Sequence, residues 1–575
     1  MTPLTQDPPA APELFERLLK IAEASGFSDR VQMIEALETA AHLQQSLVRT
    51  LLDLPQFPER EFLHQLAAAF HLRWVEAGAA FRSDGEFPAR LALRYQVLPL
   101  EAEGDERVLA TYDPLDLLAR SVIQQHFVNY RVRLVVSSRK FILGALRECY
   151  GIGAETFEAL LEGREEQGMD ASAAPEVNIL DGEDAEASVM KFVNQIIREA
   201  LVEHATDIHI EPLGTDLRIR YRIDGVLHET PVPANIKLLQ ASVLSRVKIM
   251  ANLDIAEKRI PQDGRISLEL GGKPIDVRVA TIPSVTGETI SLRLLGQERF
   301  DFSRLGLDPH SETLIRGLLA MPNGIVLVTG PTGCGKSTSL YTFLSSLNTK
   351  ERRIVTIEDP VEHKLSGVIQ IAVRPEINLT FANALRSVLR GDPNVIMVGE
   401  MRDLETAEIA VRAALTGHLV FSTLHTNDSV GGITRLMDMG VEPFLIGSSV
   451  RAFIAQRLVR RLCPECKRPA DFSADKLREI GFPQGASPRI FAPQGCDACR
   501  QTGYRGRTAL YEICAMTPNL EELIQHKASG KRLRAEAMAE GMLPLRDYGW
   551  QRVREGTTSI EEVLRVTAAE VGGGE

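Results

Sequence analysis

The chain has 575 residues, more than a single hydrophobic core supports, so we expect about three or four domains. Its composition, 44% hydrophobic and 25% charged, is that of a globular protein, and we find no apolar run long enough to cross a bilayer. The net charge of −12 excludes a chain that binds nucleic acid through its overall charge.

The opening residues and the cysteines both bear on the cellular compartment in which the protein is expected. No apolar core follows the opening MTPLTQDPPAAPELF, so we expect no secretory signal. Of the seven cysteines, Cys149, Cys334 and Cys514 are scattered singly, as is usual in a reducing compartment. We therefore expect a cytoplasmic protein whose association with a membrane is peripheral.

The first third of the chain carries no chemical motif. Residues 1–56 predict an N-terminal helical segment, in which two or three short amphipathic helices follow a Pro- and Ala-rich, disordered start. Residues 57–151 mix helices and strands, and 95–116 predicts a hairpin followed by a helix. Residues 152–187 are acidic and rich in small side chains, which is typical of an interdomain linker.

A middle domain is predicted over residues 188–300, with a first helix and then several strands. Residues 217–225 alternate between apolar and basic side chains with the period of a strand. The run 266–282 predicts a hairpin that turns at 271–272, and 288–295 predicts another strand.

The basic face of this predicted sheet has two interpretations. Arg218, Arg220 and Arg222 alternate with apolar residues, so they share one side of the strand. They form either a solvated surface or, for some of them, a surface that faces the phosphates of a neighbouring subunit.

From about residue 301 to 575, strands followed by helices predict a mostly parallel sheet. Residues 325–341 read IVLVTGPTGCGKSTSLY, a phosphate loop between a buried strand and an amphipathic helix. The glycines let backbone N–H groups surround phosphate oxygens, Lys336 would reach the β- and γ-phosphates of ATP, and Ser337 would ligate Mg²⁺. We expect the nucleotide to contact Gly330, Pro331, Thr332, Gly333, Cys334, Gly335, Lys336, Ser337 and Thr338.

Three later strands each end in a polar residue, at the end of the sheet where open α/β folds bind ligands. Glu400 follows one strand, and we expect it to orient or deprotonate the attacking water. Glu358 and Asp359 end another and would hold Mg²⁺ through its waters. His425 follows the last strand and either senses the γ-phosphate or is a structural hydrogen-bonded residue.

Two arginines on a predicted helix extend this set. Arg386 and Arg390 lie four residues apart and therefore share one helix face. They would stabilise negative charge on the transferred phosphoryl group, or they form salt bridges at the surface.

Four cysteines predict a metal site within residues 460–510. Cys463 and Cys466 form one CxxC pair, and Cys496 and Cys499 form a second, with 29 residues between the pairs. Two such pairs are typical of a closed, structural Zn²⁺ site, and the long spacing predicts a small subdomain between them. A redox CxxC motif is the competing interpretation, although one pair would suffice for it.

The run RAFIAQRLVRRL, residues 451–462, is locally basic. It predicts either a contact surface for a protein or a phospholipid, or an amphipathic helix with a solvated basic side.

The motifs together closely resemble one family. GPTGCGKSTSLY, TIEDPVEH and VIMVGEMRDLETAEIAVRAALTGHLVFSTLHTND, with the paired CxxC motifs, resemble the secretion ATPases, more narrowly the assembly motors of type II secretion systems and type IV pili. The resemblance covers about residues 57–570. In that family the residue matching Glu400 is the catalytic glutamate.

The resemblance also implies a multidomain α/β architecture. It gives a C-terminal RecA-like P-loop ATPase core over 301–575 with a zinc-binding insertion. A PAS-like α+β domain over 188–300 precedes the core, and an N-terminal α/β docking domain of the type II secretion ATPases lies at 57–151. Cys334 departs from the serine that is commoner at its position, and we expect it to be compatible with activity.

A homo-hexameric ring is a further implication of the resemblance. The arginines that act on a neighbouring subunit map to Arg278 and Arg293, joined by Arg386 and Arg390 from the core. The family works at the inner membrane through platform proteins, so we expect those partners and a peripheral location. Ring closure requires a heterologous interface.

Four functions are candidates for this chain. A motor for type II secretion and a type IV pilus extension motor share every motif, and residues 57–151 favour the secretion type. A nucleic-acid motor for DNA uptake or transfer is disfavoured by the acidic charge and by the lack of an aromatic and basic stacking tract. A scaffold without hydrolysis is disfavoured because Lys336, Ser337, Asp359 and Glu400 are all present.

Overall fold

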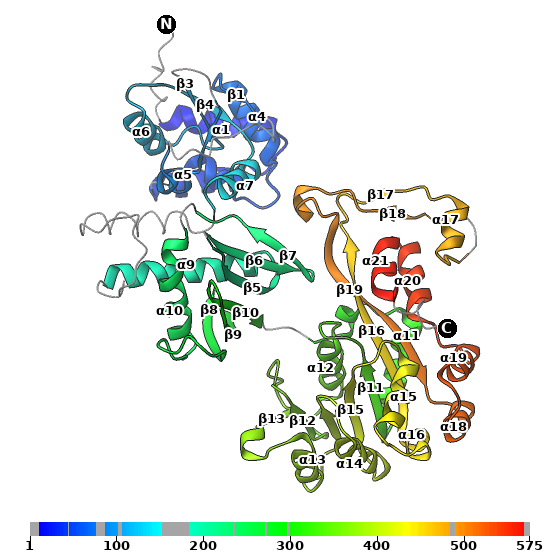
Figure 1. Cartoon of the computed structure of the whole chain (residues 1–575). Helices are drawn as coiled ribbons and strands as arrows, with labels where there is room; N and C mark the ends of the chain where they lie inside the picture. The colour runs from blue at the N-terminus through cyan, green and yellow to red at the C-terminus, as the bar shows by residue number, and fades with distance from the viewer. Residues whose placement is uncertain are drawn as a thin grey trace. The chain divides into compact units, whose positions relative to one another are not determined.

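The computed structural model divides the chain into two units, Met1–Gly296 and Gln297–Glu575 (Figure 1). The first unit contains a four-stranded and a six-stranded sheet, and the second a seven-stranded and a two-stranded sheet. The described residues are 11–43, 45–75, 87–101, 106–151, 183–214, 216–233, 236–270, 273–295, 300–483 and 489–568. The Pro-rich start up to residue 10, most of the predicted linker and the turn at 271–272 lie outside them.

Short helices open the first unit, which confirms the prediction for this segment. Asp29 and Ser46 cap the second and third of them by accepting hydrogen bonds from backbone N–H groups of their first turns. The helices are α1 (Ala11–Ala24), α2 (Arg30–His42), α3 (Leu47–Leu52) and α4 (Glu59–Ala69).

A mixed sheet in the order β1-β4-β3-β2 follows these helices. The predicted hairpin and helix are confirmed, because β2 and β3 pair antiparallel and α6 comes next. Buried residues from α1 to α7 form one core, so the N-terminal helical segment packs with the domain after it. The elements are β1 (Arg73–Trp74), α5 (Ala89–Tyr95), β2 (Val97–Leu100), β3 (Glu106–Thr111), α6 (Leu117–His126), β4 (Arg131–Val136) and α7 (Arg139–Tyr150).

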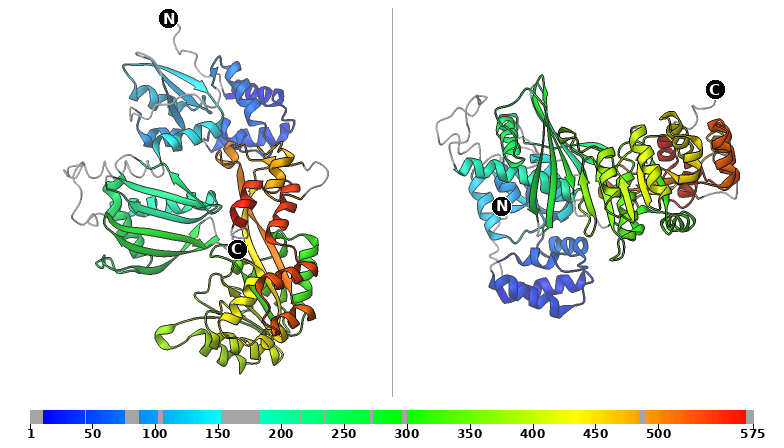
Figure 2. Two further views of the ribbon diagram at one scale, coloured as in Figure 1. Left: turned by 45° about the vertical axis from the view of Figure 1, so that its right-hand side comes forward. Right: turned by 90° about the horizontal axis from the view of Figure 1, so that it is seen from below.

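The middle domain is an antiparallel sheet in the order β7-β6-β5-β10-β9-β8, seen from further sides in Figure 2. Apolar residues of one sheet face pack against α9 and α10, which leaves the basic side chains on the other face. The α+β character is confirmed, whereas the PAS-like assignment remains a prediction. The elements are α9 (Glu183–Val202), β5 (Ala205–Pro212), β6 (Leu217–Ile223), β7 (Val226–Thr230), η1 (Ile236–Leu239), α10 (Gln240–Met250), β8 (Gln262–Leu270), β9 (Lys273–Ser284) and β10 (Gly287–Leu295).

The second unit contains the predicted, mostly parallel sheet, in the order β13-β12-β14-β15-β11-β16-β19. Neighbouring strands are parallel except β16 and β19. Separate apolar cores form around it, one with α13 to α16 and the other with α11 and α12. The strands are β11 (Gly324–Thr329), β12 (Ile354–Glu358), β13 (Ile369–Ala372), β14 (Val395–Val398), β15 (Leu419–Leu424), β16 (Val450–Leu462) and β19 (Tyr504–Ala515).

Helices connect and cover these strands, as the predicted strand–helix alternation requires. They are η2 (Phe302–Leu305), α11 (Pro309–Leu319), α12 (Lys336–Leu347), η3 (Pro375–Ile377), α13 (Phe381–Leu389), α14 (Leu404–Leu415), α15 (Ser429–Asp438), α16 (Pro443–Ser449), α18 (Pro518–Gln525), α19 (Gly530–Ala539), α20 (Leu545–Arg554) and α21 (Ile560–Thr567). Within the described part of the chain, no helix is both long and apolar enough to span a membrane.

The basic run at 451–462 is a strand, so its interpretation as an amphipathic helix is wrong. It forms most of β16, which lies between β11 and β19 and is buried along most of its length. A central strand buried on both faces loses the simple alternation of a surface strand. Its basic residues gain partners instead: Arg460 pairs with Glu562 at 2.8 Å.

A small subdomain separates the two CxxC pairs, as the spacing predicts. β17 (Arg468–Pro469) and β18 (Phe491–Ala492) pair antiparallel and are joined through α17 (Ala474–Glu479). The second CxxC pair spans the short helix η4 (Asp497–Cys499).

Candidate active site and cysteine cluster

The phosphate loop runs between β11 and α12, and a side chain at either of two of its glycines would clash with the neighbouring strand. Gly330 and Gly335 have φ values of +146° and +93°, which L side chains rarely adopt. A Cβ on Gly330 would lie 2.7 Å from the carbonyl oxygen of Gln456, and one on Gly335 would lie 2.7 Å from the Gln456 amide nitrogen. The loop backbone therefore packs directly against β16, with its shape set by the neighbouring strand.

Lys336 is the first residue of α12 and lies over the loop. Its Nζ donates hydrogen bonds to the carbonyl oxygens of Gly330 at 2.7 Å and Pro331 at 3.1 Å. Burial lowers the pKa of Lys336, and the Arg457 guanidinium lowers it as well, although Cys334 and Glu400 act in the opposite direction. An ammonium placed beside the loop can neutralise phosphate charge, as the motif predicts.

A cavity of about 260 Å³ lies at the carboxyl ends of the parallel strands. The residues that follow β12, β14 and β15 meet there with the phosphate loop, which is the convergence that the sequence predicts. Its polar lining includes Thr332, Ser337, Tyr341, Glu358, Asp359, Glu362, Glu400, Arg402, Thr423 and His425.

Glu400 presents its carboxylate to this cavity with 13% of the side chain exposed. Its Oε1 lies 2.6 Å from an Nη of Arg402, and its Oε2 lies 3.7 Å from Nε2 of His425. Burial and the Lys336 ammonium lower the pKa of His425, an effect opposed by Glu400, so the ring is favoured in its neutral form at neutral pH. A carboxylate and an imidazole thus lie close enough to share a water.

Glu358 and Asp359 are adjacent in sequence and differ in environment. Glu358 is 4% exposed, and its carboxylate accepts hydrogen bonds from the Tyr341 hydroxyl, from Thr356 Oγ1 at 2.5 Å and from Gln370 Nε2 at 3.0 Å. Asp359 is exposed and lines the cavity. Their predicted role toward Mg²⁺ remains a prediction, and the geometry favours Asp359 for it, because the Glu358 oxygens are already used.

Arg386 and Arg390 lie on α13 and contact nearby polar residues. Arg386 pairs with Glu405 and also donates to Asn383 at 3.1 Å, and Arg390 donates to Ser387 at 3.3 Å. Neither is among the described residues that line the cavity. These contacts correspond to the surface alternative, and the predicted role in phosphoryl transfer remains a prediction.

Arg278 and Arg293 belong to the other unit, on the outer face of the middle-domain sheet. They are directly opposite each other on β9 and β10, and Arg265 on β8 is opposite Arg278. Arg293 also contacts Asp207, with its Nε 3.0 Å from Oδ1. Like charges directly opposite on a sheet repel. This row of guanidinium groups is therefore suited to an anion.

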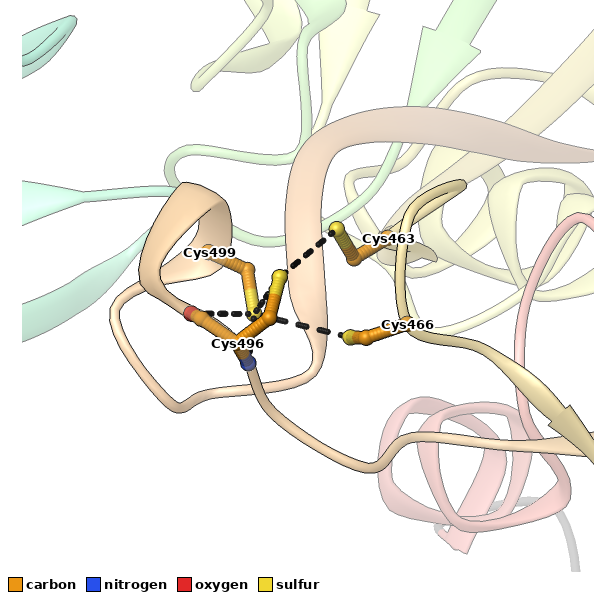
Figure 3. A group of neighbouring side chains, drawn as sticks. All are labelled: Cys463, Cys466, Cys496 and Cys499. Atoms are coloured by element: carbon orange, nitrogen blue, oxygen red, sulfur yellow. Dashed lines mark hydrogen bonds between the residues drawn. The ribbon is translucent and has the colours of Figure 1, made fainter. Parts of the chain in front are cut away.

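The four predicted cysteines converge from two separate segments (Figure 3). Their sulfur atoms all lie within 4.8 Å of one another, with 3.9 Å between Cys463 and Cys496 and 3.7 Å between Cys466 and Cys499. A tetrahedral zinc with Zn–S bonds of about 2.3 Å separates its sulfur ligands by about 3.8 Å. The backbone N–H of Gly503 donates to Cys499 Sγ at 3.2 Å. The residues therefore fit a closed Zn²⁺ site.

Comparison with known proteins shows the family to which the chain belongs. Residues 182–565 match the family described as "Type II/IV secretion system protein", which is more than half of the sequence. The chain belongs to the type II/IV secretion system protein family. Residues 74–156 match a second family, the MshEN domain, and this match overlaps most of the region where we predict a docking domain.

Relatives within this secretion family are ATPases. The chain is 50% identical over 394 residues to the type II secretion system ATPase E of Vibrio cholerae, covering 68% of this chain and 77% of that protein. It is 42% identical over 489 residues to the type IV pilus assembly ATPase PilB of Myxococcus xanthus, covering 84% and 86%. This member of the secretion family is thus an ATP-hydrolysing enzyme, which confirms the resemblance drawn from the motifs.

Solved structures support the fold. The Legionella pneumophila ATPase DotB superposes with a TM-score of 0.50 at 22% identity, covering 66% of this chain and 96% of that one. At that identity the similarity concerns the fold alone, and it agrees with the mixed α/β architecture described above.

Sequence reasoning missed several residues of this secretion ATPase. Arg402 comes two residues after Glu400, and the strand-end rule that found Glu400 would have found it too. Tyr341 lies on α12 one helical turn beyond Ser337, with no motif to mark it. Gln456 and Arg457 lie beneath the loop on β16, and the wrong helical interpretation of that run concealed them. Arg265 is apparent only from the strand register.

Proposed function

We propose that this chain is a ring-forming motor that hydrolyses ATP to ADP and phosphate and drives the assembly of pilin-like filaments in type II protein secretion. One observation carries the proposal: the phosphate loop, Glu400, Asp359 and His425 meet at one cavity at the end of a parallel sheet. The 50% identity to a type II secretion ATPase supports the choice of machine.

Several residues at the cavity and the adjacent loop have roles in the proposed hydrolysis. Lys336, which lies against the loop carbonyl oxygens, and the loop backbone would bind the phosphates, and Ser337 would hold Mg²⁺ together with waters bound to Asp359. Glu400 accepts a proton from the attacking water, and His425 lies near enough to Glu400 to contact the same water or the γ-phosphate. The order of strands β12, β14, β15 and β11 supports a RecA-like core.

The ring is proposed to be a homo-hexamer in which the PAS-like domain of one subunit acts on its neighbour. Arg278 and Arg293 would contact the neighbour's nucleotide, and their position on an exposed sheet face supports this. Arg386 and Arg390 would add positive charge from the core. Zn²⁺ bound to the four cysteines would hold the 460–510 subdomain in a fixed geometry, a structural role.

The protein is proposed to work in the cytoplasm, at the inner membrane, where it docks on platform proteins through its N-terminal domain. Nucleic acid is not proposed as a partner, because the net charge is −12. Type IV pilus assembly is the second candidate, and a specific observation favours it: the similarity to PilB extends over 84% of the chain, compared with 68% for the secretion ATPase.

Glu400→Gln tests the enzyme assignment. The variant keeps the shape of the carboxylate and cannot accept the proton, so we expect ATP binding with hydrolysis lowered by about 10² or more. Phosphate release and binding of a fluorescent ATP analogue measure the two properties. Full turnover in this variant would mean that another residue activates the water.

The ATP-bound Glu400→Gln protein also tests the machine. It serves as bait in solubilised membranes of the native host, with a variant that lacks residues 1–160 as the control. Recovery of a secretion platform, lost with the truncation, supports type II secretion and the docking role. Recovery of pilus components instead would support type IV pilus assembly. In a separate assay, stimulation of ATP hydrolysis by DNA would support a nucleic-acid motor.

A further inference from the structure

Gln456 is a buried polar residue of β16 beneath the phosphate loop. Strands β11 and β16 pair in parallel as far as Thr329 and Ala455, where β11 turns into the loop and β16 continues. Gln456 is the first residue of β16 beyond that point, and it is 2% exposed. The four residues before it, 452–455, are apolar and buried. A primary amide that follows such a run is costly to bury unless it is hydrogen-bonded.

One hydrogen bond fixes the orientation of the Gln456 amide. Ser339 lies in the first turn of α12 and is also buried, and its Oγ donates to Oε1 of Gln456 at 2.8 Å. The oxygen and the nitrogen of an amide lie on opposite sides, so this bond turns Nε2 toward Gly335, where a Cβ would lie 2.7 Å from it. The amide is therefore held between the loop helix and the loop itself.

The main chain of Gln456 contacts the other end of the loop. Its carbonyl oxygen would lie 2.7 Å from a Cβ on Gly330. The same oxygen accepts a hydrogen bond from the buried Arg457 at 3.1 Å, and that guanidinium also donates to the carbonyl oxygen of Asn427 at 2.6 Å. One residue of β16 thus packs against the loop at both Gly330 and Gly335.

The affinity of such a loop for phosphate depends on the shape of its backbone. Successive N–H groups bind phosphate oxygens when they point to one centre. Glycine has more backbone freedom than any other residue, so a glycine-rich loop loses more entropy when it is held in one shape. A rigid support that packs against the glycines reduces this cost before the nucleotide arrives. Gln456 is placed to give that support.

We propose that Gln456 is a positioning residue for the nucleotide: it holds the phosphate loop in the shape that binds the β-phosphate, with its amide oriented by Ser339. Gln456 acts through the loop and contacts neither the nucleotide nor the reacting atoms. ATP and ADP share the β-phosphate, so the support raises the affinity for both. Hydrolysis of bound ATP depends on Glu400 and is affected little. This inference rests on the proposed function, because it takes the loop as the nucleotide site.

Gln456→Met and Ser339→Ala in the full-length protein test this inference. Gln456→Met keeps the length of the side chain and removes the amide, and Ser339→Ala leaves the amide without its anchor. We expect each to weaken binding of ADP and of a non-hydrolysable ATP analogue by about tenfold, in the range of one lost hydrogen bond and equally for both ligands. The kcat at saturating ATP should stay within about threefold.

The double variant adds a readout that a merely structural role would not give. Gln456→Met and Ser339→Ala remove the same contact, so the affinity lost in the double variant should not exceed the loss in Gln456→Met alone. Two substitutions that only destabilise the fold independently would instead give additive losses. Titration of a fluorescent ADP against the three variants measures the coupling.

Ser449→Ala is the matched control. Ser449 is also buried, and its hydroxyl donates to the carbonyl oxygen of Leu445 at 2.6 Å. It immediately precedes β16 at the end where Val450 pairs with Ile325, the opposite end of β11 from the loop. Ser449→Ala should lower the melting temperature as Ser339→Ala does and leave the affinity for both nucleotides within about twofold.

Three results would overturn the inference: unchanged nucleotide affinity in Gln456→Met, additive losses in the double variant, or an equal loss of affinity in Ser449→Ala. If Gln456→Met does not fold, Ser339→Ala alone decides, because it removes the same hydrogen bond. Lys336→Ala separates this inference from the proposed function. If Lys336→Ala loses nucleotide binding and Gln456→Met does not, only this inference fails. If Lys336→Ala binds nucleotide normally, the proposed function fails with it.

Discussion

Tyr341 connects the phosphate-loop helix to the strand end at Glu358. Its hydroxyl donates to the buried Glu358 carboxylate and accepts the backbone N–H of Glu362 at 3.1 Å. A residue of α12 thus fixes the segment that carries Asp359. The loop and the predicted magnesium-binding segment are coupled by one side chain.

Tyr341→Phe removes these hydrogen bonds and retains the ring. We expect a loss of about 1–3 kcal/mol in the free energy of unfolding, because a buried carboxylate loses a donor. Magnesium-dependent ATP affinity should fall as well, since Asp359 is less well positioned. Urea unfolding and nucleotide titration measure the two effects.

Tyr221→Phe is the comparison for this substitution. Tyr221 is also buried, but its hydroxyl donates to the backbone carbonyl of Ile196 in the middle domain. Tyr221→Phe should lower the free energy of unfolding and leave nucleotide affinity unchanged. Equal nucleotide affinity in the two variants would contradict the link between Tyr341 and the site.

Among the elements, β16 joins two parts of the ATPase unit. It packs beside β11 under the phosphate loop at one end and leads into the first CxxC pair at the other. Arg460 of this strand and Arg565 of α21 both pair with the buried Glu562, at 2.8 and 2.7 Å. The cysteine subdomain is thus attached to the nucleotide site through one continuous strand.

Metal removal should loosen this subdomain locally. Chelation is expected to release about one zinc per chain, because a tetrahedral site uses all four thiolates. Hydrogen exchange should then increase in residues 460–510 and stay slow in the strands around the phosphate loop. Cys496→Ser should have the same effect, and Cys149→Ser, outside the cluster, should not. Protein purified with reduced thiols and no zinc would refute the metal assignment.

At the scale of the whole molecule, the two units hold different parts of the proposed reaction. Arg278 and Arg293 lie in the first unit, and the phosphate loop and Glu400 lie in the second. A ring in which each active site uses arginines from a neighbour would make hydrolysis depend on assembly.

Mixing two inactive variants tests this dependence. Arg293→Gln and Glu400→Gln should each be inactive alone, and their mixture should regain hydrolysis where a subunit with Glu400 meets a neighbour with Arg293. Random mixing in a closed ring gives about a quarter of such interfaces. Phosphate release in the mixture measures the recovery.

Arg218→Gln is the control for the mixing experiment. Arg218 lies on the same sheet face and pairs with Glu211 at 3.1 Å, so its loss should leave the activity intact. A mixture that stays inactive would contradict action between subunits.

The sequence by itself determined the chemistry of the site. The phosphate-loop pattern and three strand ends predicted the nucleotide cavity, because parallel strands present their carboxyl ends at one edge of a sheet. The CxxC spacing likewise predicted the cysteine cluster, since the ligand types and their number define the site. The hairpins and most helices followed from local periodicity.

Only the tertiary structure decided which residues engage each other. β16 was ambiguous because a strand buried on both faces lacks alternation, and its place between β11 and β19 depends on residues far apart in sequence. Glu358 and Asp359 are adjacent carboxylates that the sequence gives no means to distinguish. In the structure Glu358 is buried and bonded to Tyr341, whereas Asp359 is exposed. The pairing of Arg402 with Glu400 and the row formed by Arg265, Arg278 and Arg293 likewise depend on side-chain direction and strand register, which no local pattern encodes.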